Sequence, residues 1–197
     1  MKPTKNDIIS NVSETLNNLN EISNNKFKYE FLSKYDPLNF VLGKYCSCCA
    51  HIEGVGKGIM KASILHPDCQ NLVIRDDKGK IIAKSTLYIN REQGYGVFNN
   101  VEVNNSVTST EKKEIYKKYK EAVEAFANRY NELNSDNPIN KITVGMHLND
   151  LNKEIISHNH ISISILKGME FSKYGAYDGD WQKAQYVIWE KTNKKNK

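Results

Sequence analysis

Asn71-Leu-Val-Ile-Arg75 and Lys80-Ile-Ile-Ala-Lys-Ser-Thr-Leu-Tyr-Ile-Asn90 are joined by the turn sequence Asp76-Asp-Lys-Gly79, and these two segments decide the fold. A second polar turn, Arg91-Glu-Gln-Gly94, leads into Tyr95-Gly-Val-Phe-Asn-Asn-Val-Glu-Val103. The segments are rich in β-branched and aromatic residues, which favour strands, and the glycine-containing turns favour hairpins. The sequence therefore predicts three consecutive antiparallel strands.

A long helix is expected after the third strand. Thr108-Ser-Thr-Glu111 matches a capping box, and apolar residues then recur at helical spacing as far as Leu133. Asn134-Ser-Asp-Asn-Pro138 ends the helix, and Lys141-Ile-Thr-Val-Gly-Met-His147 has the pattern of a further strand. Because strand–helix–strand crossovers are right-handed and join parallel strands, the third and fourth strands are expected to be parallel neighbours.

Shorter elements are expected on both sides of this stretch. Apolar residues at helical spacing predict an amphipathic helix over residues 7–22. A second short helix over residues 28–34 and a short strand over residues 40–42 follow it. After the fourth strand, the pattern predicts a short helix over 149–156, a strand or helix end over 162–166, a loop over 171–177 and a last strand over 185–189.

Composition is that of an ordinary globular protein, with 39% hydrophobic and 26% charged residues. No apolar run approaches the ~20 residues that span a bilayer, and the N-terminus lacks the pattern of a secretory signal, so we expect a cytoplasmic protein without a membrane partner. The net charge is +5, but four of the lysines lie in the last seven residues (Lys191, Lys194, Lys195 and Lys197). The folded body therefore lacks the clustered basic face that nucleic acid requires.

All four cysteines fall between residues 46 and 69. Cys46 and Cys49 form a Cys-x-x-Cys pair, and His66 and Cys69 form a His-x-x-Cys pair, which is a spacing that zinc sites use. The four residues predict a closed, structural zinc knuckle, in which Cys48 or His51 is able to replace one ligand. The alternative is that the cysteines are small buried hydrophobic residues.

The order of elements resembles the GNAT superfamily, the acyl-CoA-dependent N-acetyltransferases, over about residues 71–190. The resemblance implies an α+β fold, namely a GNAT-like mixed sheet with an antiparallel meander, a long helix crossover and N-terminal helices, into which the zinc knuckle is a small insertion. It implies a single domain over residues 1–190, with N-terminal helices over 5–45, the knuckle over 46–69 and the core over 71–190. A basic flexible tail over 191–197 follows.

The resemblance also implies where the acyl donor, acetyl-CoA or another acyl-CoA, binds. Its pantetheine arm pairs with the strand over residues 95–104, and its pyrophosphate lies at the N-terminus of the long helix, where the helix dipole favours an anion. The implied cofactor-binding residues are Val103, Asn104, Ser106, Thr108, Ser109, Thr110 and Asn149. The family's glycine signature is absent from this loop, so hydroxyl groups replace the glycine backbone or serve only to cap the helix.

An acyl transfer to an amine needs a base for the amine and an acid for the departing thiolate. The resemblance implies Glu102 as the base, Tyr174 or Tyr177 as the acid, and His147 at the end of the crossover strand as a further catalytic candidate. Two functions follow. One is an N-acyltransferase that acts on an unknown small-molecule or peptide amine, and the other is an inactive, zinc-stabilised module that binds a protein partner. An open gap between the third and fourth strands favours the enzyme, whereas a gap filled by residues 106–110 contradicts it.

Overall fold

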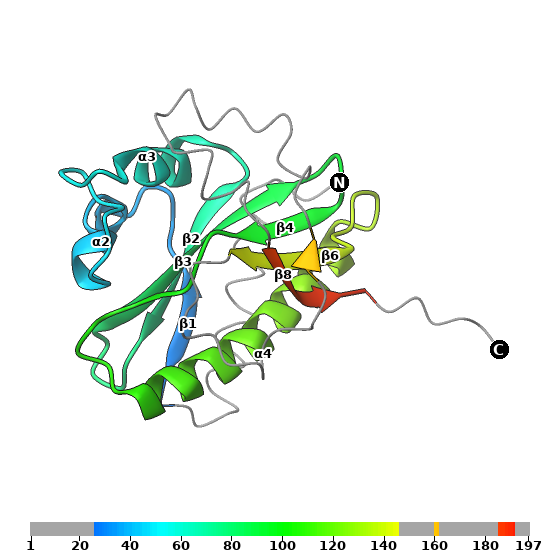
Figure 1. The fold of residues 1–197 in the computed structure, drawn as a ribbon. Helices are drawn as coiled ribbons and strands as arrows, with labels where there is room; N and C mark the ends of the chain where they lie inside the picture. The colour runs from blue at the N-terminus through cyan, green and yellow to red at the C-terminus, as the bar shows by residue number, and fades with distance from the viewer. Residues whose placement is uncertain (1–25, 146–159, 162–184, 192–197) are drawn as a thin grey trace.

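The computed structural model describes residues 26–145, 160–161 and 185–191. In this part of the chain, eight strands form one mixed sheet with the order β1-β2-β3-β4-β6-β8-β7, and β5 pairs with β3 (Figure 1). The strands are β1 (Lys28–Phe31), β2 (Cys69–Arg75), β3 (Ile81–Asn90), β4 (Tyr95–Phe98), β5 (Glu102–Val103), β6 (Lys141–Gly145), β7 (His160–Ile161) and β8 (Gln185–Glu190).

The predicted meander is confirmed. Strands β2, β3 and β4 pair antiparallel in sequence order. The two turns place Gly79 at a φ of 78° and Gly94 at a φ of 69°, a left-handed conformation that glycine adopts without strain. The parallel pairing is also confirmed, since β4 runs parallel to β6 from Tyr95↔Lys141 to Phe98↔Val144. The last predicted strand is β8, which pairs antiparallel with β6.

The long helix α4 (Ser109–Leu133) covers one face of the sheet (Figure 1). It begins at Thr108 with the predicted capping box. Its apolar stripe packs on the side chains that β2, β3, β4 and β6 direct to that face, and Phe98 meets Tyr119 with ring centroids 5.4 Å apart. This is the main hydrophobic core. Because α4 is long and anchored along its length, it fixes the loop of residues 104–108 against the end of β5.

Shorter helices cover the opposite face of β2 and β3. They are the 3-10 helix η1 (Pro37–Phe40), α2 (Leu42–Tyr45) and α3 (Lys57–Leu65). Side chains alternate across a strand, so Leu72 and Ile74 face α4, while Val73 faces a smaller apolar cluster that contains Leu42 and Cys46. The polar residues of the candidate site lie on this second face.

Two predicted elements are wrong. Residues 28–34 do not form a helix, because Tyr29 and Phe31 alternate inward on β1, which pairs with β2, and the Tyr29 hydroxyl donates to Ile115 O at 2.8 Å. Residues 40–42 do not form a strand, because Asp36 caps η1 and α2 follows directly. The predicted helices over 7–22 and 149–156, the 162–166 element and the 171–177 loop lie outside the described residues.

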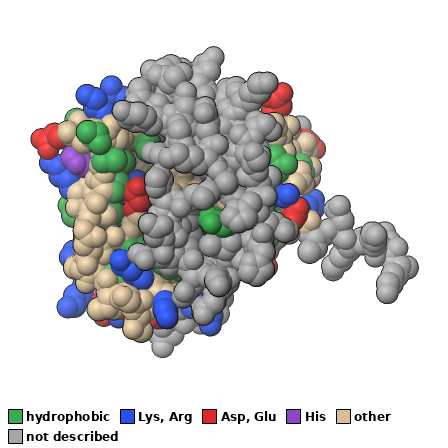
Figure 2. All heavy atoms as spheres, viewed as in Figure 1, with side chains coloured by type: hydrophobic (Ala, Val, Ile, Leu, Met, Phe, Trp, Pro, Cys, Tyr) green, Lys and Arg blue, Asp and Glu red, His purple; other side chains and the backbone are tan. Residues whose placement is uncertain are grey.

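The described helices include none that is both long and apolar enough to cross a bilayer. On the face that Figure 2 shows, the Lys and Arg side chains are scattered rather than gathered into one basic stripe.

Candidate active site

The chain that forms β4 and β5 leaves β6 after Phe98. From Leu87 to Lys84, β3 advances three residues, while its partner advances four, from Phe98 to Glu102. The additional residue is a β-bulge, a feature that bends a strand and re-aims its side chains, and that is common beside active sites. Beyond the bulge, β5 pairs with β3 and, among the described residues, with no other strand. The sheet therefore forks between β5 and the end of β6.

The side chain of Asn99 binds β3 where the fork begins. The Thr86 N–H donates to Asn99 Oδ1 at 2.8 Å, and the Asn99 N–H donates to Thr86 O at 3.0 Å. The amide oxygen of the side chain thus replaces the backbone carbonyl of an unbroken ladder. A Cβ on Gly145, the last residue of β6, would lie 1.9 Å from Asn99 O. Glycine at this position is required for β6 to approach the bulge.

The outer edge of β5 is oriented into the fork. The Asn104 N–H donates to Ile82 O at 2.8 Å, and Glu102 lies opposite Lys84. Hydrogen-bonded and non-bonded pairs alternate in an antiparallel ladder, so the N–H and C=O of Val103 point away from β3. An extended ligand with amide groups is able to pair with this edge as a further strand would. The predicted cofactor-binding residue Val103 therefore presents its backbone groups at the outer edge of β5, and its role in binding stays a prediction.

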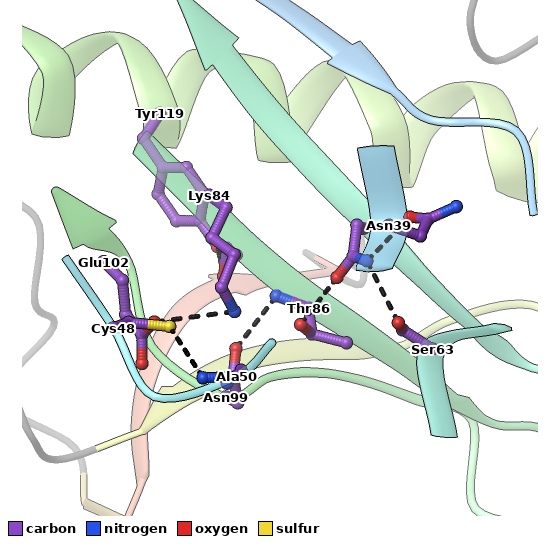
Figure 3. Close-up of polar contacts among 11 residues, drawn as sticks. Asn39, Cys48, Ala50, Ser63, Lys84, Thr86, Asn99, Glu102 and Tyr119 are labelled. Atoms are coloured by element: carbon purple, nitrogen blue, oxygen red, sulfur yellow. Dashed lines mark hydrogen bonds and ion pairs between the residues drawn. The ribbon is translucent and has the colours of Figure 1, made fainter. Parts of the chain in front are cut away.

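Glu102 and Lys84 form a buried charge pair on the face opposite α4 (Figure 3). The Lys84 side chain is 2% exposed, the Glu102 side chain is 23% exposed, and Nζ lies 3.5 Å from Oε2. Burial is the largest single influence and lowers the pKa of the Lys84 ammonium, but the charge and hydrogen bond of Glu102, together with the neighbouring Cys48 and Cys46 thiols, outweigh it and the pKa is raised. The ammonium stays charged at neutral pH, and strand pairing holds it directly opposite the carboxylate of the predicted base.

Two thiols lie beside this pair. Burial raises the pKa of both Cys46 and Cys48 to about 12, although the nearby Lys84 ammonium opposes that rise. The Ala50 N–H donates to Cys48 Sγ at 3.3 Å, and Ser47 between the two cysteines has a φ of 55°. Both cysteines are therefore neutral thiols near pH 7.

The predicted zinc knuckle is wrong. Among the residues that the structure describes, no three His, Cys, Asp or Glu side chains converge in a way that holds a metal ion. Cys46 packs in the apolar cluster beneath α2, Cys69 is buried at the start of β2, and Cys49 is exposed. His66 Nδ1 accepts the Asp68 N–H at 3.1 Å, and its ring lies edge-on to Tyr88. The sequence brings these residues close along the chain, but the fold turns them to different surroundings.

A buried polar network continues from the bulge along the same face (Figure 3). Thr86 Oγ1 donates to Asn71 Oδ1 at 2.7 Å, and Asn71 Nδ2 donates to Asn39 Oδ1 at 2.9 Å and to Ser63 Oγ at 3.0 Å. The network fixes η1 and α3 to β2, β3 and the Asn99 bulge. The sequence analysis did not identify it. Its signal was the polar residues at alternate positions of otherwise apolar strands, Asn71 on β2 and Thr86 on β3.

The loop before α4 uses most of its own hydrogen-bond donors. The Ser106 N–H and hydroxyl donate to Asn104 Oδ1 at 2.8 and 2.7 Å, and the Thr108 N–H donates to Glu111 Oε2 at 3.1 Å. The Glu111 N–H donates to Thr108 Oγ1 at 3.3 Å, which completes the capping box. Within the described part of the chain, the backbone N–H groups of Ser109 and Thr110 donate no hydrogen bond. An anion thus finds two donors at this helix end rather than a full loop of them.

The carboxylate of Glu111 already places a negative charge at the N-terminus of α4. Its Oε1 accepts from Lys26 Nζ at 2.5 Å, and the hydrogen bonds from Lys26 and Thr108 lower the pKa of the Glu111 carboxyl to about 2. The loop also contacts the segment after α2, since Asn104 Nδ2 donates to Tyr45 O and the Asn105 N–H donates to Ser47 Oγ at 3.5 Å. The fit of the chain to an acyl-CoA is therefore uneven. The fork suits the extended arm, and the helix end suits a diphosphate only in part.

The described residues thus bring together Glu102, Val103, Asn104, Ser106, Thr108, Ser109 and Thr110, which line β5 and the loop that follows it. The other predicted site residues, His147, Asn149, Tyr174 and Tyr177, lie outside the described residues. Sequence reasoning missed Lys84 and Asn99. A lysine within an apolar strand was the available signal for Lys84, and an Asn-Asn pair in a strand was the signal for the bulge.

The forked mixed sheet and the crossover helix define an α+β protein with an acid beside the fork. No protein-family model matches the chain, and no curated protein matches it either. The catalytic domain of the Tetrahymena GCN5 histone acetyltransferase in complex with coenzyme A is similar at 11% identity and a TM-score of 0.46, covering 87% of this chain and 97% of that chain.

Two further solved structures are also similar to this chain. The Vibrio cholerae spermidine N-acetyltransferase in complex with CoA and spermine has 11% identity and a TM-score of 0.41, covering 75% of this chain and 78% of that chain. A tandem GNAT protein from the clavulanic acid biosynthesis pathway has 12% identity and a TM-score of 0.37, covering 61% of this chain and 36% of that chain. By name, these three solved structures are a histone acetyltransferase domain, a spermidine N-acetyltransferase and a tandem GNAT protein, which are the class of protein that the predicted resemblance names. At these identities the likeness concerns the fold alone.

Proposed function

We propose that this chain is a GNAT-like N-acyltransferase that moves an acyl group from acyl-CoA to an amine. The observation that carries the proposal is the fork, because a bulge opens the sheet beside a carboxylate held by a buried lysine. The amine nitrogen attacks the thioester carbon, the C–S bond breaks, and an amide and the free thiol of CoA are the products.

The residues of the chain have distinct roles in this proposal. Val103 pairs through its backbone with the arm of the acyl donor, and the N–H groups of Ser109 and Thr110 donate to its phosphates. Glu102 accepts the proton that the amine loses, and Lys84, whose Nζ lies 3.5 Å from Glu102 Oε2, positions that carboxylate. Acyl-CoA supplies the activated thioester. The roles of His147, Asn149, Tyr174 and Tyr177 remain predictions.

A first experiment measures thermal stability with and without millimolar acetyl-CoA, because a ligand that binds only the folded state stabilises it by about 2.7 kcal/mol at a hundredfold excess over its dissociation constant. We expect an upward shift of Tm. In a panel of primary amines, release of free CoA then identifies acceptors, and Glu102→Gln is expected to abolish that release while the Tm shift persists. A folded protein whose Tm does not respond to acetyl-CoA contradicts the proposal.

One observation favours a second candidate, an inactive module that binds a protein partner. The exposed large hydrophobic side chains of the described residues all lie between residues 35 and 65 (Tyr35, Phe40, Tyr45, Ile52, Val55 and Leu65). Apolar side chains gathered on one segment are typical of an interaction surface. The capping box, which occupies donors of the expected phosphate site, points the same way. Absence of the acetyl-CoA response would select this candidate.

A further inference from the structure

The amide oxygen of Asn100 lies at the apex of the fork. It is buried and, among the described residues, accepts no hydrogen bond. A Cβ built on Gly145 would lie 2.8 Å from it, so the oxygen faces the end of β6, where Gly145 contributes no side chain. A buried acceptor without a donor destabilises a fold, which makes such a group a candidate for contact with a ligand.

The residues around Asn100 explain why its side chain is oriented this way. Phe98 and Val101 both pack in the core beneath α4, which leaves Asn99 and Asn100 as the two bulge residues between them. The Asn99 side chain is engaged with the Thr86 N–H. Gly145 has no side chain that supplies a donor. The donor for Asn100 Oδ1 is therefore expected from a ligand that lies in the fork.

We infer that Asn100 is a specificity-determining residue for the acyl donor, and that Asn100 Oδ1 accepts the amide N–H of the pantetheine arm nearest the sulfur. This inference rests on the proposed function. In pantetheine, two methylene groups separate that nitrogen from the sulfur, a span close to the ~3.3 Å rise of one strand residue. Asn100 and Glu102 are two residues apart, so a nitrogen held at Asn100 places the thioester between them, within reach of the proposed base.

The contact predicts which ligands the chain distinguishes. A thioester that keeps the amide makes the hydrogen bond, whereas a nucleotide that lacks the arm does not reach the fork. Loss of the acceptor oxygen should therefore weaken the binding of acetyl-CoA and leave the binding of adenosine 3′,5′-bisphosphate unchanged. The loss of one buried hydrogen bond corresponds to about a tenfold change in affinity.

Calorimetric titrations of acetyl-CoA and adenosine 3′,5′-bisphosphate test the inference in the full chain. Asn100→Leu removes the acceptor at similar volume, Asn100→Asp keeps an acceptor oxygen, and Asn137→Leu makes the same change at an exposed position beyond the end of α4. We expect Asn100→Leu to lower acetyl-CoA affinity about tenfold or more, with nucleotide affinity unchanged. Asn100→Asp should retain most of the acetyl-CoA affinity, and Asn137→Leu should bind both ligands like the wild type.

Thermal stability without ligand separates ligand contact from a structural role. Asn100→Leu removes a buried acceptor that has no partner, so its Tm should equal or exceed that of the wild type. If the wild type binds acetyl-CoA and Asn100→Leu binds it equally well, the inference is overturned while the proposed function stands. Equal weakening of both ligands also overturns it. If the wild type binds neither ligand, the proposed function and the inference fail together.

Discussion

Lys84→Met and Glu102→Gln, alone and together, measure the charge pair on which the proposed base depends. At a separation of 3.5 Å and an effective dielectric constant of about 20, the attraction between the two charges is about 5 kcal/mol. Removing one partner of a buried pair destabilises a protein by about 3–5 kcal/mol, because the other charge stays buried and unpaired. Lys84 is the more deeply buried partner, so Glu102→Gln should destabilise more than Lys84→Met.

The double variant should be far more stable than the two single effects predict, since a neutral pair leaves no unpaired charge. We expect a coupling energy of about 2–3 kcal/mol in a cycle of urea unfolding curves. Lys118→Met is the matched control. It breaks the exposed pair with Glu121, in which the two side chains are 25% and 50% exposed, and should change stability by less than about 1 kcal/mol. Single effects below that value, or effects that simply add, would refute the reasoning.

The pair also predicts a response to alkali. The pKa of Lys84 is raised in the folded state, so its contribution to stability is complete below the pKa of the unfolded chain, about 10.4, and is lost as the pH rises through the folded value. Urea midpoints of the wild type should therefore fall above about pH 10 more steeply than those of the Lys84→Met/Glu102→Gln double variant.

Three more outcomes follow from the same geometry. Gly145→Ala should destabilise by about 1–3 kcal/mol in urea unfolding, because its Cβ would lie 1.9 Å from the Asn99 carbonyl oxygen and the backbone must move. Glu111 has a pKa lowered to about 2, so its stabilising effect is present above about pH 4.5 and is lost as the pH falls towards 2; melting curves of Glu111→Gln should lack that part of the acid decline. S-acetylpantetheine should bind within about tenfold of acetyl-CoA in calorimetry, because the fork fits the arm better than the helix end fits a diphosphate; a much larger difference would place most of the affinity at the α4 N-terminus.

Local signals in the sequence were enough for the frame of the fold. The glycine turns at Gly79 and Gly94 determine the hairpins, and the Thr108–Glu111 box marks the first residue of α4. Both act over a few residues, which is why they can be interpreted without knowledge of the rest of the chain. Residues 28–31 are different. Their place in a strand depends on pairing with β2, about 40 residues away, and on the contact between Tyr29 and α4.

A residue of the candidate site could be predicted from the sequence only where its own chemical type and its place along the chain both indicate a role. Glu102 was identified because an acid on that strand has an obvious use, whereas Lys84 was not, because its partner is set by the register of β3 against β5. A register changed by one bulge residue cannot be inferred from the pattern of either strand alone. The zinc prediction failed because it relied on spacing along the chain alone. Cys46, His66 and Cys69 have the right spacing along the chain, but ligation requires convergence in space, and burial keeps the Cys46 and Cys69 thiols neutral.

The fork and the helix end together indicate how this chain would hold an acyl donor. A loop rich in glycine offers a phosphate many backbone donors, but here the Glu111 carboxylate takes the Thr108 N–H, and Lys26 balances its charge. A diphosphate at this end must compete with the Glu111 carboxylate, which already accepts hydrogen bonds there. The helix dipole therefore stabilises a bound diphosphate less than it would at a helix end without this carboxylate. At the fork the situation is reversed, since the backbone groups of Val103 that point away from β3 and the buried oxygen of Asn100 gain partners when an amide-bearing arm enters. Binding energy is therefore expected to concentrate beside Glu102, where the reaction takes place, rather than at the nucleotide.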